Sequence, residues 1–106
     1  MKNWYVYILR CKDNSLYTGI TNNIQKRYQK HKSGKGARYT KIKGVEKIEI
    51  IFTLENRSEA SKIEYFIKRK NKKYKELLVK DEKEQKKFIK NINEFYEIKI
   101  QIETEK

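Results

Sequence analysis

The chain has 106 residues, a length that suits one compact domain and not two. Lysine and arginine total 27 against 14 aspartates and glutamates, a formal net charge of +13, and no run approaches the roughly 18 apolar residues of a membrane span. The excess of positive charge favours a polyanionic partner, namely DNA, RNA or an acidic membrane surface, although a merely solvated lysine-rich surface would have the same composition. Among these we expect DNA, or alternatively RNA, and no membrane partner.

Cysteine and histidine usage limits the chemistry of the chain. Cys11 is its only cysteine and His31 its only histidine, which excludes an internal disulfide and a multi-cysteine zinc site. Any metal should be a hard ion held by oxygen ligands. With no signal-peptide pattern at the N-terminus, the expected setting is reduced and cytoplasmic.

The first twenty residues have the pattern of a β-hairpin. Trp4–Leu9 is an apolar, aromatic and β-branched run that predicts a buried strand. Turn-forming residues follow at 12–15, and β-forming residues resume at Leu16–Ile20. Two such runs joined by a short turn predict antiparallel pairing.

A helix and a basic loop are predicted next. Asn22 or Asn23 can cap the helix, which should run to about His31. Residues 34–44 hold three of the four glycines together with several basic residues, and this composition predicts a loop.

The alternation of apolar residues over 48–52 predicts a third strand with one buried face. Ser58 can cap a second long helix, whose apolar stripe is formed by Ala60, Ile63 and Ile67 at helical spacing.

A third helix is predicted over 81–95, with Phe88, Ile92 and Phe95 as its apolar positions. The tail over 97–106 then has isoleucine at alternate positions, a strand pattern without a preceding turn signal. Such a strand can bury its apolar face against the edge of the domain or in self-association, and the first is favoured because chain ends usually dock locally.

Two pairs of side chains could carry chemistry. Tyr7 and Tyr17 lie on the two hairpin strands and can approach across the sheet, although tyrosine is also simply a good strand former. Arg27 and His31 are four residues apart and share a helix face, which suits phosphate contact; a solvated face is the alternative.

Glu64 is the most informative acid. It lies four residues after Ala60 and three before Ile67, which predicts a place on the inner stripe of the helix. Carboxylates are rarely buried unless they are paired or bind a metal. An ion pair with a neighbouring cation and a metal site are equal alternatives.

In this order the residues resemble the GIY-YIG nuclease superfamily, and in length the small stand-alone bacterial members. Tyr5-Val6-Tyr7 is a degenerate first motif, in which Tyr5 replaces the glycine and Tyr7 keeps the tyrosine, and Tyr17-Thr18-Gly19 is close to the second motif. Arg27, His31 and Glu64 follow at matching places, and the ordered set is more specific than either motif alone.

The resemblance covers roughly residues 3–80 and implies an α+β fold, a small three-stranded antiparallel sheet flanked by helices. We assign residues 1–80 to a GIY-YIG nuclease-like domain and residues 81–106 to a C-terminal helix and tail packed on the same domain. The tail over 97–106 is expected to be dispensable for cleavage, because it lies beyond the resembling stretch.

The resemblance also implies roles. Glu64 matches the metal ligand of the family, usually for Mg²⁺ or Mn²⁺, and Arg27 matches the arginine that holds the scissile phosphate. Tyr7, Tyr17 and His31 match the cluster that handles the nucleophilic water and the water shell of the metal.

Two positions depart from the pattern of some family members. Ile20 stands where some carry a lysine just after the second motif. Glu76, or in another register Asn71, stands where some carry a late asparagine.

The main nucleic-acid contacts are expected from the basic loop, at Lys35, Arg38, Tyr39 and Lys41, together with the basic run Lys68–Lys75. Glycines let the backbone approach phosphates, and the Tyr39 ring offers a stacking face.

Three functions follow in order of preference. The first is a metal-dependent endonuclease that hydrolyses phosphodiester bonds in DNA, structure-selective and linked to DNA repair or processing. The second is a basic nucleic-acid binding module with little or no cleavage activity. The third, a purely structural basic protein, is disfavoured because a simple binder needs the lysines but not the Glu64 carboxylate.

Overall fold

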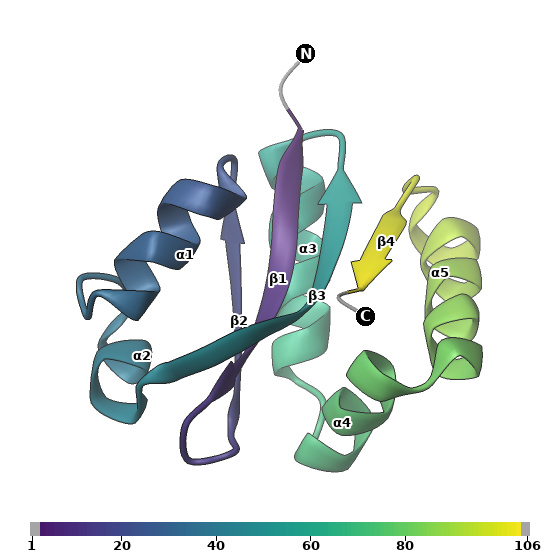
Figure 1. Ribbon diagram of the computed structural model, residues 1–106. Helices are drawn as coiled ribbons and strands as arrows, with labels where there is room; N and C mark the ends of the chain where they lie inside the picture. The colour runs from purple at the N-terminus through teal and green to yellow at the C-terminus, as the bar shows by residue number, and fades with distance from the viewer. Residues whose placement is uncertain (1–2, 105–106) are drawn as a thin grey trace.

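The computed structural model describes residues 3–104, which are built around an antiparallel sheet (Figure 1). The strands are β1 (Trp4–Cys11), β2 (Leu16–Thr21), β3 (Val45–Leu54) and β4 (Gln101–Thr104). Their order across the sheet is β2-β1-β3-β4, which makes β2 an edge strand. The α+β class is as predicted, but the sheet has a fourth strand in addition to the three expected.

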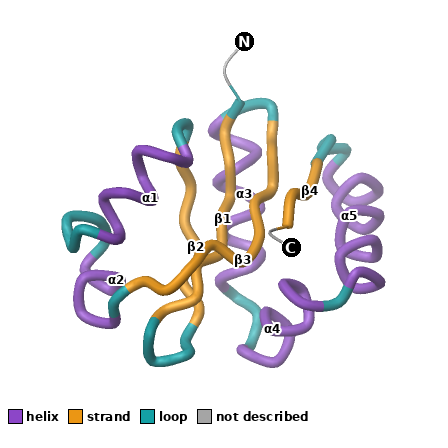
Figure 2. Tube along the Cα trace, viewed as in Figure 1, coloured by secondary structure: helices purple, strands orange, loops and turns teal. Residues whose placement is uncertain are grey.

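The helices within residues 3–104 are α1 (Ile24–Lys32), α2 (Arg38–Lys43), α3 (Arg57–Lys68), α4 (Lys72–Lys80) and α5 (Glu82–Tyr96). Helix α1 packs on one face of the sheet with α2 next to it, α3 lies behind the sheet on the opposite face, and α4 and α5 lie toward β4 (Figures 1 and 2). None of the helices in this described part is long and apolar enough to cross a membrane.

The alternation of side chains along β1 divides the interior into two parts. Val6 and Ile8 point into the main core, whereas Tyr7 and Leu9 point to the opposite face and pack with α1. The main core also takes Ile50 and Phe52 from β3, Ala60, Ile63 and Ile67 from α3, Leu78 from α4, and Phe88 and Ile92 from α5. Tyr7 is therefore placed on the face that α1 covers.

Asparagine caps define the starts of α1 and α3. The Asn23 side chain accepts a hydrogen bond from the Lys26 amide at 3.1 Å, which decides between the two predicted caps of α1. The predicted Ser58 cap of α3 is wrong, because Asn56 has the extended backbone of a cap and accepts from the Glu59 amide at 2.9 Å. The helix thus begins one residue before Ser58, at Arg57.

The prediction of a continuous loop over 34–44 is also wrong, because α2 forms inside it. The Thr40 hydroxyl donates to the Ala37 carbonyl at 2.9 Å, and Gly44, with a φ of 75°, ends the helix. Gly34 and Gly36 precede the helix, so the glycines that suggested a loop flank α2 rather than interrupt it.

The described part of the tail, residues 97–104, lies against the edge strand β3 of the remaining sheet. Strand β4 pairs antiparallel with β3, and Ile98 and Ile100 are buried in the main core. The missing turn signal is Glu97, which caps α5 in the left-handed conformation with a φ of 54° and redirects the chain without a glycine. The prediction for Phe95 is wrong, since the last turn of α5 leaves this side chain 80% exposed.

We predict that removal of residues 97–106 lowers the free energy of unfolding by about 3–6 kcal/mol, because two buried isoleucines are lost at about 1.5–3 kcal/mol each. Urea denaturation of the shortened chain, beside the double variant Ile98→Ala/Ile100→Ala, measures the effect. Cleavage should persist wherever the shortened chain stays folded, because β4 and β2 are opposite edges of the sheet. A shortened chain as stable as the parent would contradict this role for the tail.

Candidate active site

The β1–β2 hairpin brings Tyr7 and Tyr17 together on one face. Tyr7 lies opposite Gly19 and Tyr17 lies opposite Leu9, and the two tyrosine ring centroids are 6.4 Å apart. A Cβ atom at position 19 would lie 2.5 Å from the Tyr7 hydroxyl oxygen and 3.1 Å from the Tyr17 ring. The glycine of the second motif is therefore the residue that lets both rings occupy this face.

Helix α1 adds His31 to the tyrosine pair. The His31 Nε2 atom lies 2.7 Å from the Tyr7 hydroxyl oxygen, and the His31 ring centroid is 5.3 Å from that of Tyr17. His31 is buried, with 1% of its surface exposed. Arg27, one turn earlier on the helix, lies close enough to act on the pKa of both Tyr7 and His31.

The residues after α1 close over the other side of the imidazole. The His31 Nδ1 atom lies 2.7 Å from the Thr40 hydroxyl oxygen, and Thr40 is also 1% exposed. A Cβ atom at Gly36 would lie 2.5 Å from His31 Nδ1, so this glycine allows the chain to pass directly against the ring. Sequence reasoning missed Thr40, since a threonine in a basic segment has no distinguishing pattern.

Burial sets the protonation of this cluster. It lowers the pKa of His31 to about 4, assisted by the charge of Arg27, so the imidazole is neutral at pH 7. Burial also raises the pKa of Tyr7 to about 12, against the opposing effect of Arg27 and with smaller contributions from Tyr17 and Glu64. The Tyr7 hydroxyl therefore keeps its proton near neutral pH and can release it only to a neighbouring acceptor, of which His31 Nε2 is one.

Glu64 lies at the margin of the α3 stripe and not on its inner line as predicted. Ala60, Ile63 and Ile67 are fully buried, whereas the Glu64 side chain is 23% exposed. At 3.6 residues per turn, Glu64 points roughly 65° away from the mean direction of these three. Its carboxylate forms an ion pair with Lys68 at 3.2 Å, so the ion-pair alternative is present in this structure.

The same ion pair locates Glu64 beside the tyrosines. The Lys68 Nζ atom lies 5.8 Å from the centroid of the Tyr17 ring, and the negative charge of Glu64 contributes to the raised pKa of Tyr7. The structure thus gathers Tyr7, Tyr17, Arg27, His31 and Glu64 around the edge strand β2.

A divalent metal fits this donor set only as an ion that keeps most of its own water. Residues 3–104 contain no group of three or more histidine, cysteine, aspartate or glutamate side chains that could hold a metal. Glu64 offers one partly exposed carboxylate, which suits Mg²⁺ or Mn²⁺ completed by water and phosphate oxygens and does not suit zinc.

The positions that depart from the family pattern have structural roles. Glu76 binds Arg10, a side chain that is 9% exposed, through both carboxylate oxygens at 2.6 and 2.7 Å. This contact lowers the pKa of Glu76 and ties β1 to α4, and Arg10 also pairs with Glu49. The Asn71 side chain caps α4 by accepting from the Tyr74 amide at 2.9 Å, and Ile20 packs against the main core. None of the three replaces a missing ligand or cation in the cluster.

The predicted nucleic-acid contacts lie next to this cluster. Tyr39, 39% exposed, stacks on Tyr17 with ring centroids 5.8 Å apart and an interplanar angle of 26°. Lys35, Arg38 and Lys41 are exposed, and no ion pair joins them to a carboxylate among residues 3–104. They are thus available to a polyanion.

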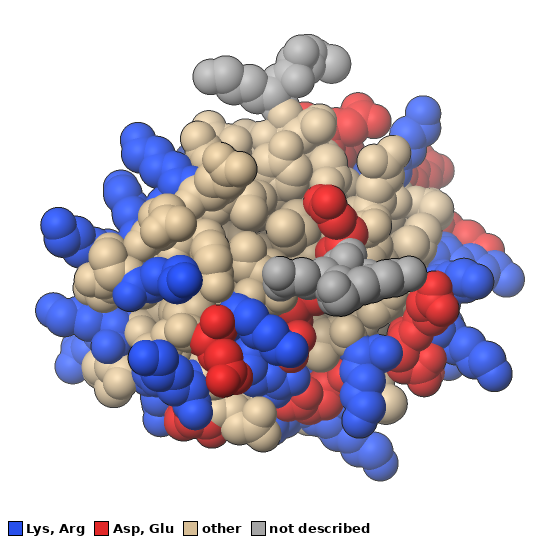
Figure 3. Space-filling model, viewed as in Figure 1, with Lys and Arg blue, Asp and Glu red and all other residues tan. Residues whose placement is uncertain are grey.

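Positive charge is concentrated in the segment that contains these residues. Between residues 14 and 45 the chain has eight lysines and arginines and no acid, so this segment carries +8 of the net +13. Residues 81–106, by contrast, carry −1. Figure 3 shows mainly blue side chains around α1, whereas red and blue are mixed toward α4, α5 and β4 on this face. This clustering favours a polyanion site over an evenly solvated surface.

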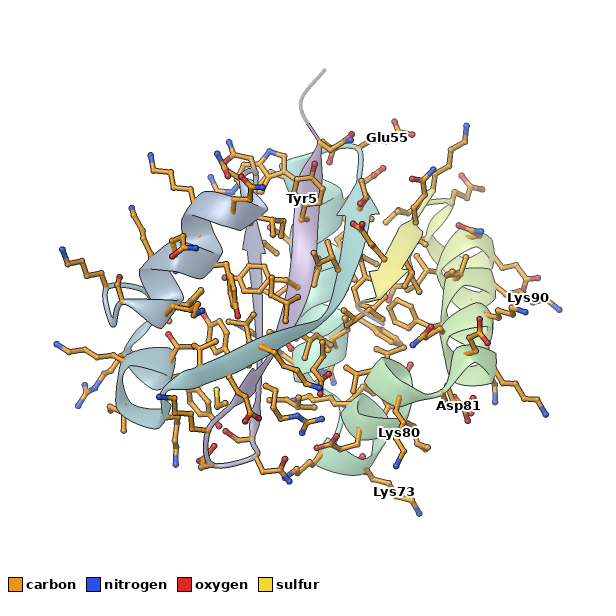
Figure 4. The ribbon with its side chains drawn as sticks, viewed as in Figure 1. Tyr5, Glu55, Lys73, Lys80, Asp81 and Lys90 are labelled. Carbon is orange, nitrogen blue, oxygen red and sulfur yellow. The ribbon has the colours of Figure 1, made fainter. Side chains whose placement is uncertain are left out.

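The basic run Lys68–Lys75, which is also predicted to contact nucleic acid, makes several contacts within the protein. Lys68 pairs with Glu64, Lys72 lies 4.0 Å from Glu76, and the Lys70 Nζ atom lies 4.6 Å from the centroid of the Phe66 ring. Lys73 on α4 points outward from the sheet (Figure 4). The Lys68–Lys75 run is therefore less available to a ligand than Lys35, Arg38 and Lys41.

Residues 3–78 match the family described as the GIY-YIG catalytic domain. The chain belongs to this family. A UPF0213 protein of Fusobacterium nucleatum is 44% identical over 97 residues, which cover 92% of this chain and 94% of that protein. The UPF0213 protein YazA of Bacillus subtilis is 40% identical over 86 residues, covering 79% of this chain and 85% of the relative.

A solved structure is also similar to this GIY-YIG domain. The solution NMR structure of a UPF0213 protein from Bacillus halodurans is 44% identical, with a TM-score of 0.49, and covers 73% of this chain and 82% of that one. The family match ends inside α4, so α5 and β4 lie beyond it, although both pack into the same core as the GIY-YIG domain.

Proposed function

We propose that this GIY-YIG protein is a metal-dependent endonuclease that hydrolyses phosphodiester bonds in DNA and acts on structured substrates in DNA repair or processing. The observation that carries the proposal is the Tyr7–His31 hydrogen bond of 2.7 Å, buried beside Arg27 and Glu64 and next to the basic segment between residues 14 and 45. A protein that only bound nucleic acid would need the surface but not the buried pair.

The chain supplies a proton path for hydrolysis. The Tyr7 oxygen accepts a proton from the attacking water while its own hydroxyl proton passes to His31 Nε2, and the water oxygen forms the new bond to phosphorus. The phosphodiester oxygen that leaves takes a proton from solvent. His31 is positioned to accept the Tyr7 proton because the ring is neutral and its Nε2 atom faces the hydroxyl. The negative charge that the water oxygen donates to phosphorus has to drive this transfer, because burial makes the imidazole a weaker base.

Arg27, together with an ion held by Glu64, would stabilise the negative charge that builds on the phosphate. The Arg27 guanidinium donates to the non-bridging phosphate oxygens and stabilises the negative charge that builds on them. A Mg²⁺ or Mn²⁺ ion held by the Glu64 carboxylate would supply further neutralisation of that charge. For the Glu64 carboxylate to bind an ion, Lys68 has to turn away, which costs little because exposed ion pairs contribute about 0–1 kcal/mol.

Incubation with branched, nicked and single-stranded DNA, and with RNA of matching sequence, tests the proposal. Each substrate is offered Mg²⁺, Mn²⁺ or a chelator. We expect cleavage of at least one DNA substrate with metal and none with chelator. Tight DNA binding without cleavage under any condition would favour a nucleic-acid binding module instead.

We predict that Arg27→Ala lowers the cleavage rate by about 10²–10³-fold, in line with about 2–4 kcal/mol for a preorganised donor. Affinity should fall far less, because Arg27 is one of 27 basic residues that attract phosphate. Single-turnover cleavage and fluorescence anisotropy separate the two effects, and Lys26→Ala on the same helix is the control. Equal losses in rate and affinity would reduce Arg27 to an ordinary phosphate contact.

A further inference from the structure

Three buried polar side chains form one continuous chain of hydrogen bonds that starts at the backbone of residue 37. The Thr40 hydroxyl donates to the Ala37 carbonyl at 2.9 Å, and the same hydroxyl oxygen lies 2.7 Å from His31 Nδ1. On the far side of the ring, His31 Nε2 lies 2.7 Å from the Tyr7 hydroxyl oxygen. Thr40 and His31 are each 1% exposed, so water does not compete for these contacts.

The direction of each bond follows from counting protons. A hydroxyl has one proton and a carbonyl oxygen can only accept, so the contact with Ala37 uses the Thr40 proton. His31 Nδ1 must then carry the hydrogen that joins it to the Thr40 oxygen. A neutral imidazole carries one N–H, so Nε2 is left with a lone pair, and Tyr7 is the donor across the last contact.

We propose that Thr40 is a positioning residue that holds His31 in the tautomer with its hydrogen on Nδ1, and so keeps Nε2 ready to receive the Tyr7 proton. The effect of Thr40 on catalysis rests on the proposed nuclease function, whereas the assignment of the His31 tautomer does not depend on that function. Thr40 reaches the ring because it lies on α2, one turn after Ala37 and next to Gly36, whose lack of a side chain leaves room at Nδ1. Helix α2 thereby serves the buried cluster as well as the basic surface.

The opposite arrangement is chemically distinct. If the Thr40 proton turned toward His31 Nδ1, the Ala37 carbonyl would keep only its hydrogen bond from the Lys41 amide at 3.0 Å. The hydrogen of the imidazole would then lie on Nε2, and the Tyr7 oxygen would have to accept it. In that state His31 could not take a proton from Tyr7, so the two tautomers predict opposite proton flow.

Nitrogen NMR reads the tautomer directly, and the sequence makes the measurement simple. Because His31 is the only histidine, ¹⁵N-histidine labelling of the full chain gives the signals of one ring without assignment. Long-range ¹H–¹⁵N correlation without DNA or metal separates a protonated nitrogen from one with a lone pair. The parent should show its hydrogen on Nδ1, Thr40→Ser should keep it there, and Thr40→Val should shift the population toward Nε2 or a mixture.

Cleavage assays complete the test. Thr40→Val should lower the cleavage rate at least about tenfold, because proton transfer from Tyr7 to His31 is impaired, and KM should not change. Thr40→Ser should keep the cleavage rate of the parent. The proposal would be overturned if the His31 ring of the parent carried its hydrogen on Nε2. It would also be overturned if the Thr40→Val protein gave the same ¹⁵N pattern as the parent. The spectrum of the parent alone tests the tautomer even if Thr40→Val does not fold. The expected NMR pattern in a protein that cuts nothing would leave the tautomer assignment standing and reject the nuclease function.

Discussion

Glu64→Gln should abolish metal-dependent cleavage while the protein stays folded. The amide keeps the shape of the side chain but removes the charge of the carboxylate that would hold the ion, and a bound ion stabilises the reaction by several kcal/mol. We therefore expect a loss of at least about a thousandfold in rate. Single-turnover cleavage with Mg²⁺ or Mn²⁺ measures the rate, and calorimetric Mn²⁺ titration measures binding. The melting temperature should barely move, because the Glu64–Lys68 pair is partly exposed.

Lys68→Gln is the matched control for Glu64→Gln. Both substitutions remove the ion pair at 3.2 Å, but only Glu64→Gln removes the carboxylate. If Glu64 binds the metal, Lys68→Gln should keep Mn²⁺ binding or strengthen it, since a competing cation has gone. Should the two variants behave alike, with cleavage near that of the parent, Glu64 would be a structural partner of Lys68 and the metal assignment would fail.

Reversing three charges of the acid-free segment should collapse DNA binding. The triple variant Lys35→Glu/Arg38→Glu/Lys41→Glu changes side chains that are exposed and unpaired among the described residues. If each cation neutralises one phosphate, the slope of log affinity against log salt should fall by about 3. Affinity at physiological salt should fall at least about a hundredfold, measured by anisotropy across a salt series.

An equal charge change elsewhere separates local contacts from net charge. Lys83, Lys86 and Lys90 are exposed on α5, far from α1 and α2 in Figure 1, and Figure 4 shows Lys90 pointing into solvent. Their reversal to glutamate gives the same net charge as the first triple variant and should cost much less affinity. Normal binding by the Lys35, Arg38 and Lys41 variant at low salt would place the nucleic-acid surface elsewhere on the molecule.

The hairpin and its tyrosines were predictable because their signals are local. Strand-forming runs on both sides of a short turn define the register, and the register alone brings Tyr7 beside Gly19. The place of Glu64 was harder to predict, because spacing from Ala60 and Ile67 gives the side of a helix but does not separate its buried line from its margin.

Other features depend on contacts that leave no mark in the sequence. The short helix α2 lies between glycines, and its Thr40 acquires a role only because Tyr7, 33 positions earlier, approaches the same imidazole. Strand β4 follows a left-handed glutamate where a glycine would be the usual signal, and it pairs with a strand about fifty residues earlier. Periodicity describes each element by itself, so it cannot rank such distant partners.

The uneven placement of charge makes the molecule an electric dipole. The segment with β2, α1 and α2 carries +8, and residues 81–106 carry −1. At 0.1 M salt a charge is felt over only about 10 Å, whereas the molecule extends 37 Å along its longest axis. A nearby polyanion would therefore attract mainly the side that faces it and would turn the protein until β2, α1 and α2 come first. Orientation before contact shortens the search for a productive encounter, and its benefit fades as salt shortens the reach of the field.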